Sequence, residues 1–170
     1  MYVRRQHQAP KSRQQVLGAV RELLQEGSFH ESTVEQVAAR AGVSRATVYQ
    51  QFGSRVGLVD AICEGLDLTT VKEVEDIDTL LERTTRFWAS EETLLDQLYG
   101  AAAVDPAARE FVDRQTHDRH AHLRGLVGAQ ALPTLALLTS FETYLELRRR
   151  AGLSERRVVA FLQEAGAKLL

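Results

Sequence analysis

A short segment of the amino-terminal half carries five side chains whose chemistry suits contacts with duplex DNA. Gln50 can bridge N6 and N7 of adenine, and Arg45 can bind either guanine or a phosphate group. Ala46 and the methyl group of Thr47 can contact thymine methyl groups, and Tyr49 can donate a hydrogen bond to a phosphate. Because the five residues lie so close in sequence, one short helix would present them together.

The helix that must position them is predicted to begin at Ser44, a residue type that favours helix amino-termini. At about 100° per residue from Ser44, Val48 points at about 40°, whereas Ala46 and Gln50 point at about 200° and 240°. The valine therefore faces the core, and the other two side chains face outward, where a DNA groove can receive them.

A second short helix is predicted directly before this one. Ser32 and Thr33 can cap its start, because each has an acidic or amide residue three positions on, as a capping box requires. Ala38 allows the two helices to cross closely, and Gly42 can take the positive φ of a sharp turn. A helix, a short turn with glycine and a second helix make up the helix-turn-helix motif.

The same segment resembles the DNA-binding signature of the TetR family of transcriptional regulators. The residues that carry the resemblance are Phe29, Ser32, Thr33, Val34, Val37, Ala38, Ala41, Gly42, Val43, Ser44, Arg45, Ala46, Thr47, Val48, Tyr49, Phe52, Arg55 and Leu58. The match runs without a gap from Val16 to Leu66. The resemblance implies that residues 44–50 form the recognition helix and that Thr33, Tyr49 and Arg55 contact the DNA backbone.

The sequence departs from the family pattern at four positions. Arg55 replaces the usual lysine at the start of the fourth helix, and both residue types can bind phosphate. Ala46 stands where the family often has glycine and Gln51 where it often has histidine, so base preference can change there. Ser28 replaces a frequent turn glycine and would strain the first loop if its φ were positive.

The resemblance also implies an all-α homodimeric regulator, usually a repressor. Its carboxy-terminal part is expected to bind a small molecule, and this ligand is expected to release the regulator from a palindromic operator. Helical periodicity continues to the carboxy-terminus, without a long alternating β pattern. The predicted organisation is a basic flexible arm over residues 1–12, a helix-turn-helix DNA-binding domain over 13–53, a connecting helix over 54–66 and a ligand-sensing and dimerisation domain over 67–170.

The ligand pocket is predicted from aromatic and polar residues of the carboxy-terminal part. The candidates are Trp88, Tyr99, Phe111, Gln115, Arg119, Phe141 and Tyr144. The aromatic members can equally be simple core, and Arg119, on an apolar helix face, needs either an internal partner or an anionic ligand. No residue names the ligand; an apolar small molecule is expected.

The dimer interface is assigned, by resemblance, to the last two long helices, expected over residues 133–150 and 154–170. Their apolar stripes supply the candidates Leu137, Leu138, Phe141, Leu145, Val158, Leu162, Ala165 and Leu169.

Three other features favour ordinary structural roles. Asp113, His117 and His120 share one helix at metal-ligand spacing, but they lie off the apolar face and fit a solvated flank better than a zinc site. Cys63 fits a packed apolar position better than a redox sensor. Residues 42–46 superficially approach the nucleophile elbow of hydrolases, but the all-α context lacks the strand that an elbow needs.

Composition narrows the function classes. The 170 residues contain 21 Lys and Arg against 23 Asp and Glu, so the net charge of −2 does not indicate a polyanionic partner. Residues 1–15, however, carry four basic residues and no acid. One cysteine excludes an intramolecular disulfide, and no signal-peptide or membrane-spanning segment is evident, so a cytoplasmic protein without cofactor is expected. The alternative to a ligand-responsive regulator is a non-sensing helical DNA-binding dimer, and an enzyme is not expected.

Overall fold

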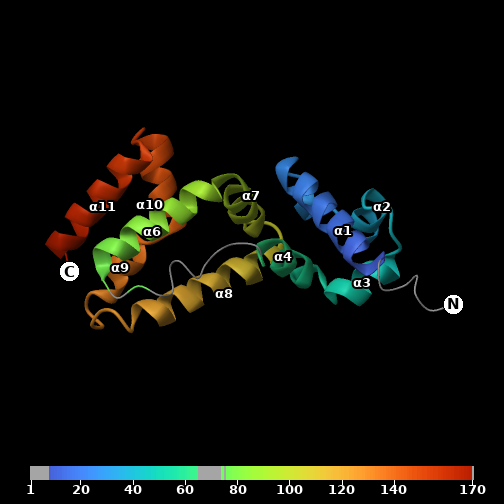
Figure 1. Cartoon of the computed structure of the whole chain (residues 1–170), viewed down its shortest axis with the longest axis horizontal. Helices are drawn as coiled ribbons and strands as arrows, with labels where there is room; N and C mark the ends of the chain where they lie inside the picture. The colour runs from blue at the N-terminus through green and yellow to red at the C-terminus, as the bar shows by residue number, and fades with distance from the viewer. Residues whose placement is uncertain (1–7, 65–73, 75, 170) are drawn as a thin grey trace. The chain divides into compact units, whose positions relative to one another are not determined.

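The computed structural model describes residues 8–64, 74 and 76–169, and every described residue is in a helix or a loop. The helices in chain order are α1 (Gln8–Gln25), η1 (Phe29–Glu31), α2 (Val34–Arg40), α3 (Arg45–Phe52), α4 (Arg55–Cys63), α6 (Ile77–Ser90), α7 (Glu92–Ala102), α8 (Pro106–Leu123), α9 (Leu132–Leu138), α10 (Phe141–Leu145), η2 (Glu146–Arg150) and α11 (Glu155–Leu169). The all-α fold predicted from helical periodicity is confirmed (Figure 1).

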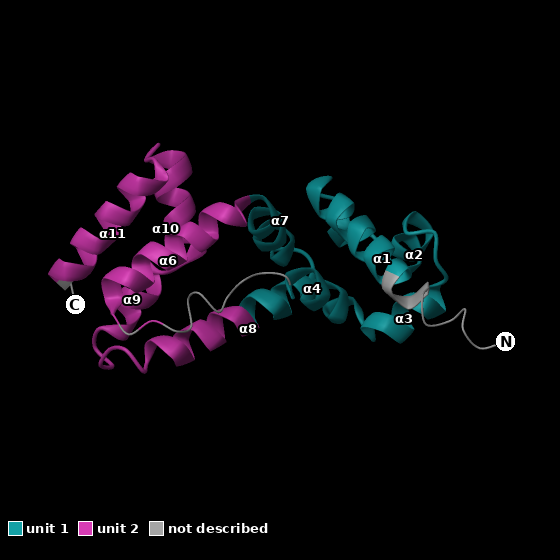
Figure 2. Cartoon of the chain, viewed as in Figure 1, with its two compact units in different colours: residues 1–66, 93–113 teal, residues 67–92, 114–170 magenta. Residues whose placement is uncertain are grey.

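The chain divides into two compact units (Figure 2). The first unit contains residues 1–66 and 93–113, and the second contains residues 67–92 and 114–170. The change of unit falls within α8 and at the start of α7. The compact amino-terminal unit thus takes in α7 and the first turns of α8, which sequence analysis assigned to the carboxy-terminal domain.

The core of the first unit forms where α1, α2, α3 and α4 bury one apolar face each. Its fully buried members include Val16, Val37, Val48 and Leu58, and α8 contributes Ala108. Burial of aliphatic side chains at this density is the main source of stability for a domain of this size. This core fixes the angle at which α2 and α3 are held.

The first helix, α1, begins at Gln8. Ser12 therefore lies inside the helix and not at its amino-terminus. Of the four basic residues among residues 1–15, Arg4 and Arg5 lie outside the described residues, whereas Arg13 pairs with Glu64 at 2.5 Å.

The turn after α1 relieves the strain that sequence analysis considered for Ser28. Gly27 takes the left-handed conformation, with a φ of 68°, and Ser28 has a φ of −101°. The glycine one position earlier therefore supplies the positive φ, and the serine is unstrained.

In the second unit, α6 packs along α11, and α11 also contacts α9. The single helix predicted over residues 133–150 is interrupted at Thr139 and Ser140, which separate α9 from α10. η2 then continues α10 directly as a π-helix. The Ser140 hydroxyl accepts a hydrogen bond from the Thr143 amide at 3.1 Å and thereby caps α10. No helix in the described part of the chain is both long and apolar enough to cross a membrane.

Candidate nucleic-acid interface

The first helix of the motif begins with the predicted capping box. The Thr33 hydroxyl accepts a hydrogen bond from the Gln36 amide at 3.2 Å, and the Gln36 side chain accepts one from the Thr33 amide at 2.7 Å. Both exchanges satisfy amide groups that a helix start would otherwise leave open. Thr33 itself is exposed, so its hydroxyl proton remains available to a phosphate oxygen.

The turn between α2 and α3 is closed by backbone hydrogen bonds. Gly42 has a φ of 66°, which only glycine adopts at little cost, and the Val43 amide donates to the Ala38 carbonyl at 3.0 Å. The predicted positive φ at Gly42 is confirmed. Because Ala38 is buried and small, the second helix leaves the turn directly beside the first.

The second helix, α3, is capped by Ser44. The Ser44 hydroxyl accepts a hydrogen bond from the Thr47 amide at 3.1 Å and lies 2.8 Å from the Thr47 hydroxyl. Its hydroxyl therefore acts as a helix cap, as expected from its position in an all-α segment.

The two faces of α3 have opposite character. Val48 is 1% exposed and Phe52 is 9% exposed, and both pack into the core of the first unit. Arg45, Ala46, Tyr49 and Gln50 are exposed, and Thr47 is half-buried. The side chains with the chemistry for base and phosphate contacts thus share the outer face of a helix that is anchored from behind.

Arg45 is held loosely on this face. Its guanidinium pairs with Glu35 of α2 at 2.7 Å and lies 5.2 Å from the centre of the Tyr49 ring. The hydrogen bond that Arg45 donates to the Tyr49 oxygen and the charge of Glu35 raise the pKa of Arg45 above its ordinary value, so it stays charged at any working pH. Exposed ion pairs contribute little stability, so a phosphate can replace Glu35 at small expense.

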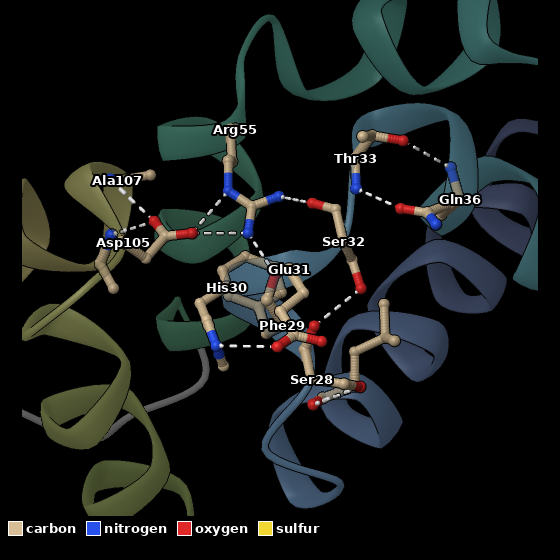
Figure 3. Close-up of polar contacts among 12 residues, drawn as sticks. Ser28, Phe29, His30, Glu31, Ser32, Thr33, Gln36, Arg55, Asp105 and Ala107 are labelled. Carbon is tan, nitrogen blue, oxygen red and sulfur yellow. Dashed lines mark hydrogen bonds and ion pairs between the residues drawn. The ribbon is translucent and has the colours of Figure 1, made fainter.

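Arg55 occupies a different environment from the one predicted. Its side chain points into the first unit and lies over the Phe29 ring, 4.1 Å from the centroid. Nε and Nη2 donate to Asp105 at 2.9 and 2.6 Å, and the terminal nitrogens also donate to the carbonyl oxygens of Phe29 and Ser32 (Figure 3). Four hydrogen bonds thus engage the guanidinium inside the domain, which opposes the phosphate contact that the resemblance implies for Arg55.

The Asp105 carboxylate accepts hydrogen bonds from groups on two helices, α8 and α4. One carboxylate oxygen accepts from the amides of Ala107 and Ala108, at 2.9 and 3.0 Å, and caps α8. The other accepts from Arg55. Asp105 is 2% exposed, and a carboxylate buried this deeply needs a cation and hydrogen-bond donors around it. The sequence signal for the cap was the pair Asp105-Pro106, but nothing in the sequence linked Asp105 to Arg55.

Gln51 also lies away from the outer face. Its side-chain nitrogen donates to the Ser12 hydroxyl of α1 at 2.5 Å. The expectation that Gln51 influences base preference is therefore wrong, since this residue holds α3 against α1. Gln50, its neighbour in sequence, is exposed.

The seven pocket candidates are divided between the two units. Phe111 is buried in the first unit, to which Tyr99 also belongs. In the second unit, the rings of Trp88, Phe141 and Tyr144 follow one another with centroids 5.4 and 5.9 Å apart. Phe141 and Tyr144 are almost completely buried, as packed core side chains are.

The polar pocket candidates lie on α8 in the second unit. Arg119 donates to the Thr139 carbonyl at 2.9 Å, and Trp88 donates to the same oxygen at 3.2 Å. Arg119 thus has an internal partner, which was one of the two alternatives that sequence analysis left open. Gln115 is half-buried.

Four of the eight predicted dimer contacts are buried within the subunit. Val158, Leu162, Phe141 and Leu138 are at most 7% exposed, so their assignment to a dimer interface is wrong. The stripe on α11 packs against α6 of the same chain, and periodicity alone does not say which partner covers an apolar face. Leu137 is 63% exposed.

The other dimer candidates are less informative. Leu145 and Ala165 are half-buried, and the Leu169 side chain lies outside the described part of the structure.

Among the described residues, no group of three His, Cys, Asp or Glu side chains is arranged to hold a metal ion. Cys63 is buried in the core of the first unit.

The geometry defines the class of domain: a compact helix-turn-helix unit whose second helix exposes polar side chains on its outer face. Residues 16–62 match the family of bacterial regulatory proteins called the tetR family. The chain therefore carries the amino-terminal helix-turn-helix domain of the TetR family, and this prediction from the sequence is confirmed.

Two relatives share this similarity. The uncharacterized HTH-type transcriptional regulator YdeS of Bacillus subtilis is 31% identical over 120 residues, which cover 66% of this chain and 61% of YdeS. The HTH-type transcriptional regulator AlkX of Mycobacterium tuberculosis is 48% identical over 46 residues, which cover 27% of this chain and 22% of AlkX. The matched segments thus span less than two thirds of either relative.

Proposed function

We propose that this protein is a DNA-binding transcriptional regulator that inserts α3 into the major groove. The observation that carries the proposal is the exposure of Arg45, Ala46, Tyr49 and Gln50 on a helix whose inner face, at Val48, is fully buried. A recognition helix must offer base-contacting side chains outward while its backbone is held rigidly from behind. The match to the TetR-family domain supports the same function.

The contacts divide into two kinds. Gln50, Ala46 and the Thr47 methyl group are assigned to base edges, whereas Tyr49, Thr33 and Ser44 are assigned to phosphates. Arg45 can serve either role, since it is exposed and paired only across the surface. Arg55 has no place in this interface and instead stabilises the domain.

The test is equilibrium binding of the purified protein to duplexes that tile the intergenic region upstream of its own gene. Measurements at about 150 mM salt screen weak electrostatic association. We expect one near-palindromic duplex to bind about 10³-fold or more tightly than shuffled duplexes. Equal and weak binding to every duplex would oppose regulation of the neighbouring genes by this protein.

We further propose that the protein acts as a homodimer on two half-sites about 34 to 36 Å apart. The support is the pair of large exposed apolar side chains on α9 and α11, two helices of the second unit that contact each other. Leu137 is 63% exposed and Phe161 is 50% exposed, so both side chains are free to pack against a second copy of the chain.

Release from DNA by an apolar small molecule, and hence a repressor role, completes the proposal. Its test is a screen of apolar compounds for thermal stabilisation, because a ligand at 100 times its Kd adds about 2.7 kcal/mol to the free energy of unfolding. The second candidate is a DNA-binding dimer that senses nothing. Compounds that stabilise the protein and weaken operator binding favour the first candidate, and a screen without either effect favours the second.

A further inference from the structure

The first unit contains a cavity that none of the features described so far uses. It has a volume of about 150 Å³ and lies among α1, the turn that follows it, η1 and the carboxy-terminal half of α7. The lining residues are Leu24, Gly27, Phe29, His30, Gln97, Gly100, Ala101 and Val104. A cavity of this volume is large enough for a single benzene ring.

The walls are mostly apolar and carry a small polar component. Leu24, Phe29 and Ala101 supply apolar surface, and the side chains of His30 and Gln97 supply groups that form hydrogen bonds. Apolar walls with one or two polar groups are the usual pattern of small-molecule sites. Val104 is 63% exposed at this cavity, an unusual exposure for a large aliphatic side chain.

Two glycines, Gly27 and Gly100, line the cavity. A Cβ atom added at either one would meet no other atom within 4 Å. Both positions therefore border open space.

We propose that this cavity binds a small phenolic compound, that is, one aromatic ring with a single hydroxyl group. The ring matches the volume and the apolar walls, and the hydroxyl group can exchange hydrogen bonds with Gln97 or His30. The site lies within the first unit, apart from the aromatic candidates Trp88, Phe141 and Tyr144 of the second unit.

A ligand in this cavity would contact Phe29, which also contacts Arg55. Phe29 lines the cavity, lies under the Arg55 guanidinium and offers its carbonyl oxygen to it. Val104, another lining residue, directly precedes Asp105. Occupancy should therefore also perturb Ser32 and Asp105, which Arg55 joins by hydrogen bonds.

The experiment is a titration of the full chain with phenol, followed by amide chemical shifts in two-dimensional ¹H–¹⁵N NMR spectra. We expect saturable shifts at Phe29, His30, Gly100 and Val104 with a Kd on the order of 1 mM, as suits a ligand of so few atoms. Smaller shifts should follow at the residues bonded to Arg55. Toluene, which lacks the hydroxyl group, should bind several-fold more weakly.

Matched glycine variants separate this site from non-specific binding. Gly100→Leu adds a large side chain at a lining position and should weaken phenol binding at least tenfold. Gly18→Leu should leave phenol binding unchanged, because Gly18 is a helical glycine of the same unit that does not line the cavity, and a Cβ atom added there would also meet no other atom within 4 Å. Ala101→Leu fills the same cavity from a neighbouring position if Gly100→Leu does not fold.

The absence of saturable shifts at the lining residues would overturn the proposal. Equal phenol affinity in the wild type and in a folded cavity-filling variant would overturn it too. Neither measurement involves DNA, so the outcome is independent of the proposed regulatory function.

Discussion

Arg55 donates from Nε and Nη2 to a single carboxylate oxygen of Asp105, at 2.9 and 2.6 Å, although the two residues stand 50 positions apart in the chain. The second oxygen of Asp105 is occupied by the first amides of α8. Arg55 also holds the carbonyl oxygens of Phe29 and Ser32, directly before the capping residue of α2. One ion pair thus joins the starts of α4 and α8 to the loop that enters the helix-turn-helix motif.

The first prediction concerns the charge of Asp105. Asp105→Asn should lower the free energy of unfolding by about 2–4 kcal/mol, because one amide group cannot both cap α8 and neutralise a largely buried guanidinium. Urea unfolding followed by circular dichroism measures the change. The matched control is Asp118→Asn, an exposed carboxylate of the same helix, for which a change within about 0.5 kcal/mol is expected. Equal effects of the two substitutions would contradict the assigned role.

The second prediction separates stability from DNA binding at Arg55. Arg55→Lys should destabilise the domain by about 1–3 kcal/mol, because an ammonium group cannot reproduce the four hydrogen bonds of the planar guanidinium. In Arg55→Ala, the dependence of DNA affinity on salt should keep its slope, since no phosphate contact is lost. The opposite pattern, with unchanged stability and a slope reduced by about one for Arg55→Ala, would restore a phosphate contact.

The third prediction compares two adjacent glutamines. Gln50→Ala should relax discrimination at one base pair by about 1–3 kcal/mol while leaving the stability of the protein nearly unchanged. Gln51→Ala should do the reverse, because Gln51 bonds to Ser12 of α1. Binding to duplexes with single base-pair changes, together with urea unfolding, checks both. A preserved base preference in the Gln50 variant would show that the outer face of α3 is placed wrongly.

The features that depend on local chemistry could be predicted from the sequence. The caps at Thr33 and Ser44, the turn at Gly42 and the inward side of Val48 all follow from residue types a few positions apart, and each is confirmed. The environment of Arg55 depends on a carboxylate 50 residues away, which no local pattern reveals. The family resemblance assigns Arg55 a phosphate contact by its position in the motif. Inside this chain, the guanidinium instead donates to Asp105.

Local sequence patterns also do not reveal which surface covers an apolar helix face. The periodicity of Val158 and Leu162 correctly indicates that α11 has one apolar side, but the covering surface is α6 of the same chain. The break between α9 and α10 was missed because Thr139 and Ser140 interrupt an otherwise helical apolar pattern only briefly. Ser140 could have been recognised as a cap from Thr143 and the residues around it, as Ser44 was.

The fourth prediction concerns pH. Tyr144 donates to Glu92 at 2.7 Å, and Arg149 pairs with the same carboxylate at 3.0 Å. The hydrogen bond from Tyr144, more than the charge of Arg149, lowers the pKa of Glu92, whereas burial raises the pKa of Tyr144 to about 12. Glu92 therefore stabilises the fold above its unfolded pKa, and this contribution is lost as the pH falls through the lowered folded value.

At alkaline pH the sign is opposite. The unfolded tyrosine loses its proton near pH 10, the folded one only near pH 12, so stability falls across this interval. Tyr144→Phe should remove the alkaline loss at this site and weaken the acid one. Unfolding free energies at pH 3 to 11 measure both limbs, and a variant whose profile parallels the wild type at both ends would contradict the assignment.

The fifth prediction tests the surface proposed for dimerisation. Leu137→Glu and Phe161→Glu should each shift the protein toward monomer with little loss of stability, because both side chains are already exposed in the single chain. Val158→Ala should instead lower stability by about 1–3 kcal/mol and leave the stoichiometry unchanged. Sedimentation velocity and urea unfolding distinguish these outcomes. A dimer that persists in both glutamate variants would place the interface elsewhere.

The most direct test of the central claim is selection of genomic fragments of the source organism by the immobilised protein at about 150 mM salt, followed by sequencing. The comparison is with a variant carrying Arg45→Ala, Tyr49→Ala and Gln50→Ala, all exposed positions of α3 that leave the core intact. We expect the wild type to enrich fragments that share a short near-palindromic sequence and the variant to enrich none. Enrichment of the same fragments by both proteins, or by neither, would contradict DNA recognition through the outer face of α3.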